Sequence, residues 1–102
     1  MKEYRARGMV IGNLWGGGIG GYPSEELKAK TKEDILKQAN KGVKEGTLDS
    51  GMGFDGLRGA VLNIEEIETI EKNGKKYSRS EYIMETIGNL TEREEELCLE
   101  NM

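Results

Sequence analysis

The chain has 102 residues, of which 35% are hydrophobic and 33% are charged, and it contains 15 glycines. This length supports one domain, residues 1–102, with little apolar material for its core, and excludes a second independent core. We therefore expect part of the buried surface to lie between copies of the chain in a homo-oligomer.

Charge and missing residue types exclude several classes of function. The net charge is −4. Residues 61–102 carry eleven acidic and five basic side chains, whereas residues 1–60 carry eight acidic and ten basic side chains. The acidic half repels phosphate backbones, so we expect no DNA or RNA polymer as a partner, whereas the basic half can hold a small anion. The sequence has no histidine, which removes the usual general base and the commonest neutral metal ligand. We expect a binding protein without enzymatic activity, cofactor or metal.

Localisation follows from cysteine usage and hydropathy. Cys98 is the only cysteine, so the chain forms no internal disulfide of the kind common in secreted domains. Met1–Arg5 lacks the apolar stretch of a signal peptide, and no apolar run approaches the ~20 residues that span a membrane. We expect a cytoplasmic protein without a membrane partner.

The first expected elements form a hairpin. Residues 4–15 alternate as a strand, with Gly8 and Gly12 marking a bulge or the close approach of another backbone. Residues 16–21 are a glycine-rich tip, and Tyr22–Pro23 resumes an extended path.

A helix is expected over residues 32–45. Thr31 is its capping residue, and Gly46 follows its last turn. Its apolar side chains recur at helical spacing at Ile35, Leu36, Ala39 and Val43.

A second hairpin and a short helix complete the chain. Residues 57–71 and 75–87 are strands joined at Asn73–Gly74, a register that places Ile70 opposite Tyr77, Glu68 opposite Arg79 and Ile64 opposite Ile83. Thr91–Glu94 is a capping box that opens an acidic helix. The order β-β-α-β-β-α predicts an α+β fold: a small antiparallel sheet with a central helix and a short C-terminal helix.

The glycine-rich tip is the first candidate site. Residues 16–21 match G-x-G-x-x-G, but no helix opens directly from them, which excludes a dinucleotide-binding fold. The backbone N–H groups of Gly16, Gly17 and Gly18 can still approach a phosphate closely. The alternative is a hairpin tip without a ligand.

Aromatic and basic side chains add further candidates. Trp15 and Phe54 lie beside glycines, a setting in which a ring can stack on a base, although core packing is the alternative. Arg58, four residues after Phe54, can pair with a phosphate, whereas Arg79 has Glu68 as an ordinary partner. Arg5 and Arg7 share a strand face with Trp15, and each is a solvated surface residue in the simplest reading.

Two clusters of acidic residues complete the survey. Asp49, Asp55 and the nearby glycines lack the inner ligands of a calcium loop, so we expect no metal there. Residues 92–100 carry a cluster of glutamates, normally a solvated helix face. This cluster supports an alternative function, an acidic inhibitor that associates with a basic protein partner.

Three segments together resemble a known family: Asn13–Gly18 (NLWGGG), Leu48–Phe54 (LDSGMGF) and Asn73–Lys75 (NGK). They are similar to the first-described family of phage Thoeris anti-defence sponges, called Thoeris anti-defense protein one. The likeness covers most of the chain, although its motifs are short and rich in glycine.

The resemblance implies a specific function. It implies capture, without cleavage, of cyclic ADP-ribose isomers made by bacterial TIR-domain enzymes, in the host cytoplasm, with cyclic oligonucleotides as further ligands at separate sites. It also implies dimers and hexamers with ligand held between protomers. The matching ligand-binding positions are Phe54 on the adenine, Asn63, and Arg79 on a phosphate, with Arg58 as a further candidate.

Overall fold

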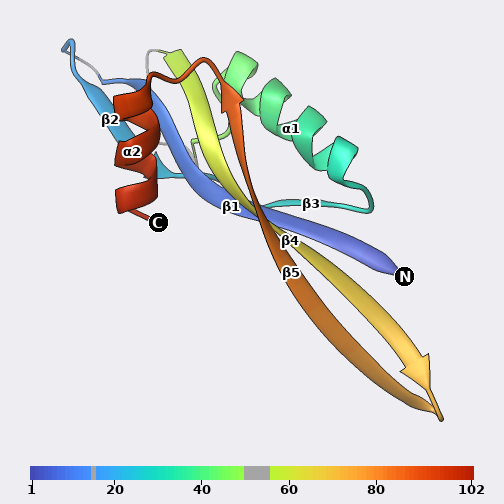
Figure 1. Ribbon diagram of the computed structural model, residues 1–102. Helices are drawn as coiled ribbons and strands as arrows, with labels where there is room; N and C mark the ends of the chain where they lie inside the picture. The colour runs from blue at the N-terminus through green and yellow to red at the C-terminus, as the bar shows by residue number, and fades with distance from the viewer. Residues whose placement is uncertain (15, 50–55) are drawn as a thin grey trace.

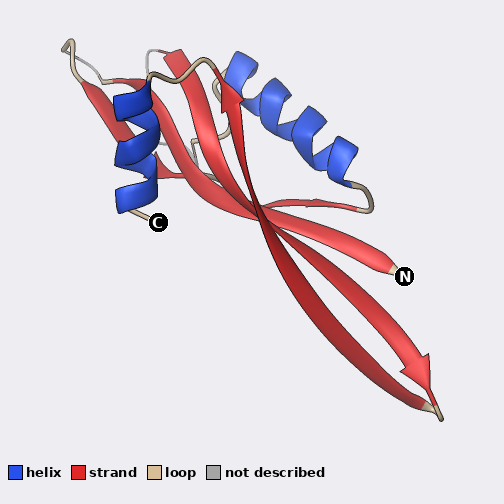
Figure 2. Cartoon of the chain, viewed as in Figure 1, coloured by secondary structure: helices blue, strands red, loops and turns tan. Residues whose placement is uncertain are grey.

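The structure is a computed structural model that describes residues 1–14, 16–49 and 56–102. In these ranges the order is β1 (Lys2–Asn13), β2 (Ile19–Pro23), β3 (Leu27–Ala29), α1 (Lys32–Glu45), β4 (Gly56–Lys72), β5 (Lys75–Gly88) and α2 (Glu92–Glu100). All described strands form one antiparallel sheet in the order β2-β1-β4-β5, with β3 also paired to β1 (Figures 1 and 2). The α+β class is confirmed, and β3 is a strand that the sequence did not predict.

The two helices cover opposite faces of the sheet. Successive residues of a strand point to opposite faces. On β1, Ala6 and Val10 pack with α1 in one core cluster, and Met9 and Ile11 pack with Cys98 of α2 in a second cluster. We call these the α1 face and the α2 face. Neither described helix is long and apolar enough to cross a membrane.

The first helix has the expected bounds because its end signals are local. The Thr31 hydroxyl accepts a hydrogen bond from the Asp34 N–H (3.2 Å), which satisfies one free donor of the first turn. Gly46 adopts a left-handed conformation (φ 73°), and its N–H bonds to the carbonyls of Gly42 and Val43. The predicted helix over residues 32–45 is confirmed.

The β4–β5 hairpin also has the predicted register. Asn73 and Gly74 both have positive φ (54° and 74°), as a tight two-residue turn requires, and the three predicted residue pairs are formed. β1 pairs with β4 only as far as Glu68, so the end of the hairpin projects as a two-stranded ribbon (Figure 1). The molecule is correspondingly elongated, with extents of 59 × 24 × 19 Å.

Strands β2 and β3 are two halves of one interrupted edge strand. β1 residues 7 and 8 lie opposite the three residues 24–26, so the edge strand carries one extra residue at this point. Residues five apart in an unbroken strand point to opposite faces, but this bulge lets Tyr22 and Leu27 both pack on the α1 core. At the bulge both backbone groups of Gly8 bond Ser24: its carbonyl accepts from the Ser24 N–H (2.9 Å), and its N–H donates to the Ser24 hydroxyl (2.9 Å).

Cys98 holds α2 against the sheet. Its side chain is fully buried beside Met9, Ile11 and Val61, and burial raises the pKa of its thiol. Because an exposed thiolate is the nucleophile that attacks a disulfide reagent, we expect Cys98 to react at least about 100-fold more slowly at pH 8 in the folded protein than in denaturant. A colorimetric disulfide reagent measures both rates. Equal rates would mean that α2 opens freely from the sheet.

Candidate functional site

A pocket opens on the α2 face beside the bulge. It has a volume of about 720 Å³ and is lined by Arg7, Gly8, Ser24 and Asn63, with Asn101 and Met102 from the end of α2. A second hollow of about 320 Å³ adjoins it and shares Arg7, Glu26 and Asn63 with it. We call the sheet residues beneath the two hollows the polar face, which comprises Arg5, Arg7, Asn63, Glu65 and Tyr82.

Strand pairing places these side chains in two neighbouring rows. Glu65 of β4 lies between Arg5 of β1 and Tyr82 of β5, and Asn63 lies beside Arg7 in the next row. Directly paired residues point to the same face, so both rows face the hollows. The short helix α2 covers only the other part of this face, next to Met9 and Val61.

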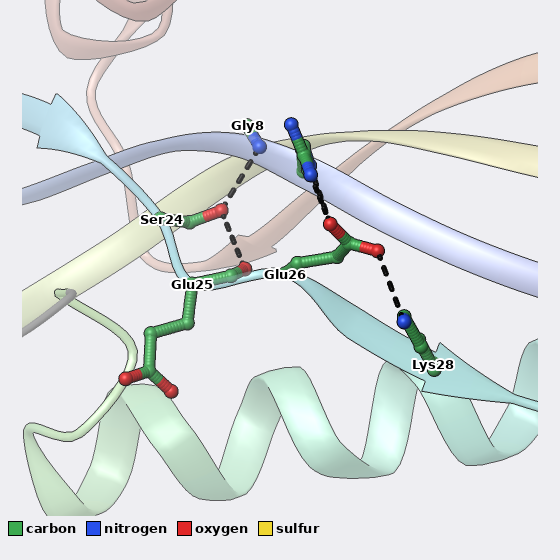
Figure 3. Close-up of polar contacts among 6 residues, drawn as sticks. Gly8, Ser24, Glu25, Glu26 and Lys28 are labelled. Carbon is green, nitrogen blue, oxygen red and sulfur yellow. Dashed lines mark hydrogen bonds and ion pairs between the residues drawn. The ribbon is translucent and has the colours of Figure 1, made fainter.

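The bulge residues Ser24, Glu25 and Glu26 also line the pocket, and Figure 3 shows the polar contacts that hold them. The buried Ser24 hydroxyl accepts a hydrogen bond from the Gly8 N–H (2.9 Å) and donates one to the Glu25 carbonyl (3.1 Å). The Glu26 carboxylate accepts a hydrogen bond from Arg7 Nε (2.8 Å) and lies 3.7 Å from Lys28 Nζ. These contacts, above all the Arg7 hydrogen bond, lower the pKa of Glu26, so it is a carboxylate at neutral pH.

Asn63 is the exceptional residue of the pocket. Its Oδ1 atom is buried and, in the part of the chain that the structure describes, has no hydrogen-bond partner. Leaving such an acceptor without a partner costs about 1–3 kcal/mol. The amide group can turn about its last torsion and exchange its oxygen with its nitrogen. Because Oδ1 itself is closed to solvent, a ligand with its own donor can satisfy this oxygen only after the amide has turned.

Several predicted site residues lie elsewhere. Trp15 and Phe54 lie outside the described residues. Gly16, Gly17 and Gly18 form the exposed tip beyond β1, where Gly17 N–H donates to the Leu14 carbonyl (3.1 Å). Because β1 rises about 3.4 Å per residue, this tip lies roughly 20 Å from Arg7.

The two predicted arginines have partners within the chain. Arg58 Nε lies 3.0 Å from Glu94 Oε2, and Arg79 pairs with Glu68 (3.1 Å), as the register predicted. Arg58 lies five residues before Asn63 on β4, and Arg79 of β5 lies opposite Glu68, five residues after Asn63. Each arginine is therefore roughly 17 Å from Asn63, in opposite directions along the sheet. Within one protomer, the structure does not bring these arginines to the pocket. Asn63 alone of the described predicted residues lines it.

Sequence reasoning treated the neighbours of Asn63 as ordinary surface or did not consider them. Arg5 and Arg7 read as solvated arginines, and Ser24 and Tyr82 gave no signal. The sequence shows only that alternate residues of a strand share a face. That pattern identifies Arg7 as a neighbour of Asn63 only when the pairing of β1 with β4 is known.

Glu94 corrects the prediction of a uniformly solvated glutamate cluster. It is only 5% exposed, whereas Glu92, Glu96 and Glu100 are exposed. The Thr91 N–H donates to its Oε1 (2.9 Å), and this bond, with the nearby Arg58 charge, lowers its pKa. Its Oε2 is buried without an aligned donor, so the contact with Arg58 is one of charge. The capping box gives the physical reason for burial, because it turns Glu94 back onto the helix start.

Comparison with known protein families, curated proteins and solved structures returned no match to this chain. Among residues 1–14, 16–49 and 56–102, no three cysteine, aspartate or glutamate side chains lie close enough to hold a metal ion. The candidate site is therefore defined by its own geometry as a mainly apolar pocket that carries one arginine, Arg7, and two carboxylates, Glu25 and Glu26. The adjoining hollow is more polar, and its two arginines are balanced by Glu26 and Glu65.

Proposed function

We propose that this protein captures a cyclic nucleotide signal, a cyclic ADP-ribose isomer or a related cyclic oligonucleotide, and holds it without cleavage. The single observation that supports this proposal is the buried, unpartnered Asn63 amide oxygen beneath a pocket that also holds Arg7. Capture of this kind would starve a downstream effector of bacterial anti-phage defence, as the family resemblance implies.

The chemistry of the polar face suits such a ligand. Guanidinium groups bind phosphates through paired hydrogen bonds, and both Arg5 and Arg7 are exposed here. Arg7 already bonds the Glu26 carboxylate, so a phosphate has to displace that carboxylate to pair with Arg7. An asparagine amide can bond an adenine edge through one donor and one acceptor. Tyr82 is 64% exposed and offers a ring face, and base stacking on an aromatic contributes about 1–3 kcal/mol. Capture requires no general base, so the absence of histidine is compatible with it.

Calorimetric titration with cyclic ADP-ribose isomers tests the proposal. We expect tight binding, and mass analysis after denaturation should return the ligand unchanged. A cleaved product would mean that the protein is an enzyme. No binding of any isomer or cyclic oligonucleotide would overturn the proposed function.

Arg7→Ala is expected to weaken this binding by about tenfold or more, because hydrogen bonds to charged groups contribute about 1.5–3 kcal/mol. Arg93→Ala is the matched control, since Arg93 is an exposed arginine on α2 that lines neither hollow. The same titration measures both. Equal affinity for the two variants would exclude the polar face as the site.

The acidic protein-binding inhibitor is the second candidate. α2 exposes Glu92, Glu96 and Glu100 together with Leu99, which is 49% exposed, a combination suited to a basic partner with an apolar centre. Reversing these three charges should weaken a salt-sensitive protein association. Glu94 should be left unchanged in this variant. Because it is buried, reversing its charge would change the stability of the fold as well as any association.

A further inference from the structure

The Glu26 carboxylate occupies the arginine that a ligand phosphate would need. Its Oε2 atom accepts hydrogen bonds from Nε (2.8 Å) and Nη2 of Arg7, an edge of the guanidinium group that pairs with oxyanions. Within the described ranges Arg7 forms an ion pair with Glu26 alone. Glu26 also lines both hollows, so a ligand anion that uses this edge of Arg7 must take its place.

The fold holds Glu26 in this position (Figure 3). Before it, Ser24 bonds both backbone groups of Gly8, and after it, Leu27 is paired with β1. A group that its own chain holds in place loses little freedom when it forms a contact, whereas a free ligand loses translational and rotational freedom on binding. Glu26 therefore has an advantage over a small anion in the competition for Arg7.

Lys28 can hold the carboxylate when it leaves Arg7. Glu26 Oε1 lies 3.7 Å from Lys28 Nζ, so one carboxylate is shared between two cations in the free protein. The side chains of Arg7 and Lys28 are 75% and 72% exposed, and exposed ion pairs contribute little. Turning toward Lys28 would therefore free Arg7 at low cost and keep Glu26 beside a positive charge.

We propose that Glu26 is an internal competitor of the ligand: its carboxylate occupies Arg7 in the free protein, gives way to a ligand phosphate and passes to Lys28. The identity of the ligand rests on the proposed function, whereas the exchange rests only on these three residues. A ligand that replaces one anion with another gains no contact at Arg7. Only a ligand that also reaches further groups of the site, such as the Asn63 amide, gains affinity, so Glu26 selects against small single anions.

Inorganic pyrophosphate is a probe that tests the exchange whatever the natural ligand is. The NMR signals of the arginine Nε–H groups follow its binding to the wild type and to Glu26→Gln. The variant keeps the size of the side chain and removes its charge. We expect it to bind pyrophosphate about fivefold more tightly, the effect of losing one exposed competing ion pair, with a shift of the Arg7 signal.

Glu3→Gln is the matched control. It makes the same change in net charge on the same face of β1, roughly 14 Å from Arg7, and Glu3 lines neither hollow of the site. At that separation salt screens most of its effect, so we expect affinity within about twofold of the wild type. An equal gain in both variants would reduce the effect to net charge and overturn the proposal.

The other results are also decisive. Equal or weaker binding by Glu26→Gln would overturn the proposal, because Glu26 would then position Arg7 instead of competing for it. A response confined to Arg5, or no binding of pyrophosphate to either protein at millimolar concentration, would overturn it as well. If Glu26→Gln gains affinity for pyrophosphate but no cyclic ADP-ribose isomer binds the wild type, the proposed function fails and the exchange stands.

Lys28→Met tests where the carboxylate goes. In the wild-type background it should weaken pyrophosphate binding by about fivefold, because Glu26 loses its second partner and stays on Arg7. In the Glu26→Gln background the loss should be less than about twofold, since no carboxylate then needs a new partner. Equal losses in the two backgrounds would show that Lys28 only attracts the probe and would overturn the transfer to Lys28.

Discussion

Gly8→Ala is expected to destabilise the protein by at least about 3 kcal/mol and to lower Tm by more than about 12 °C. A Cβ at Gly8 would lie 1.9 Å from the Val61 carbonyl oxygen and 2.8 Å from Leu62 Cα. Both neighbours are backbone atoms of the central strand β4, so no side chain can turn aside to relieve the overlap. The variant must separate β1 from β4 locally, at the point where the Gly8 N–H also bonds Ser24.

Gly56→Ala is the matched control at the start of β4. Among residues 1–14, 16–49 and 56–102, no heavy atom lies within 4 Å of a Cβ placed there, and Gly56 is not in the left-handed region. We expect stability to change by less than about 1 kcal/mol, because alanine also restricts the unfolded chain. Thermal unfolding followed by circular dichroism measures both variants. Equal melting temperatures would contradict the close approach of β1 and β4 at Gly8.

The sequence predicted the elements whose signals are local. The first helix has the expected bounds because Thr31 and Gly46 lie at its ends, and the second hairpin has the expected register because Asn73–Gly74 fixes the turn. The two glycines of β1 were also interpreted correctly. Gly8 marks a close backbone approach, and the register shifts between Ile11 and Gly12.

The sequence did not predict features that depend on distant pairing. β3 has three residues and exists as a strand because β1 lies beside it, and the bulge at residues 24–26 has no turn signal of its own. The position of Asn63 beside Arg7 depends on β1 meeting β4, two segments about 56 residues apart in the chain. Strand periodicity gives a side chain's face but not its neighbours. For this reason the sequence alone predicted Arg5 and Arg7 to be solvated surface residues, although they lie beside Asn63, which the family resemblance had indicated.

Arg58→Met is expected to destabilise the protein by about 2 kcal/mol at pH 7, because it leaves the buried Glu94 carboxylate without its neighbouring positive charge. Methionine keeps an apolar stem of similar length, so the change is chiefly one of charge. Arg93→Met is the matched control on exposed α2 surface and should change stability by less than about 0.5 kcal/mol. Denaturant unfolding at pH 7 measures both variants.

The pH dependence of this loss distinguishes charge from packing. The Thr91 N–H bond and the Arg58 charge lower the pKa of Glu94 in the folded protein. The Glu94 carboxylate therefore contributes its full stabilisation above the pKa of about 4.3 that glutamate has in the unfolded chain. This stabilisation is lost as pH falls through the lower pKa of Glu94 in the folded protein. The deficit of Arg58→Met should shrink below about pH 4, because Glu94 becomes neutral in both proteins. An equal deficit at pH 7 and at low pH would assign Arg58 a packing role. Since Asn101 and Met102, which directly follow α2, line the pocket, loosening α2 in this way should also weaken ligand capture.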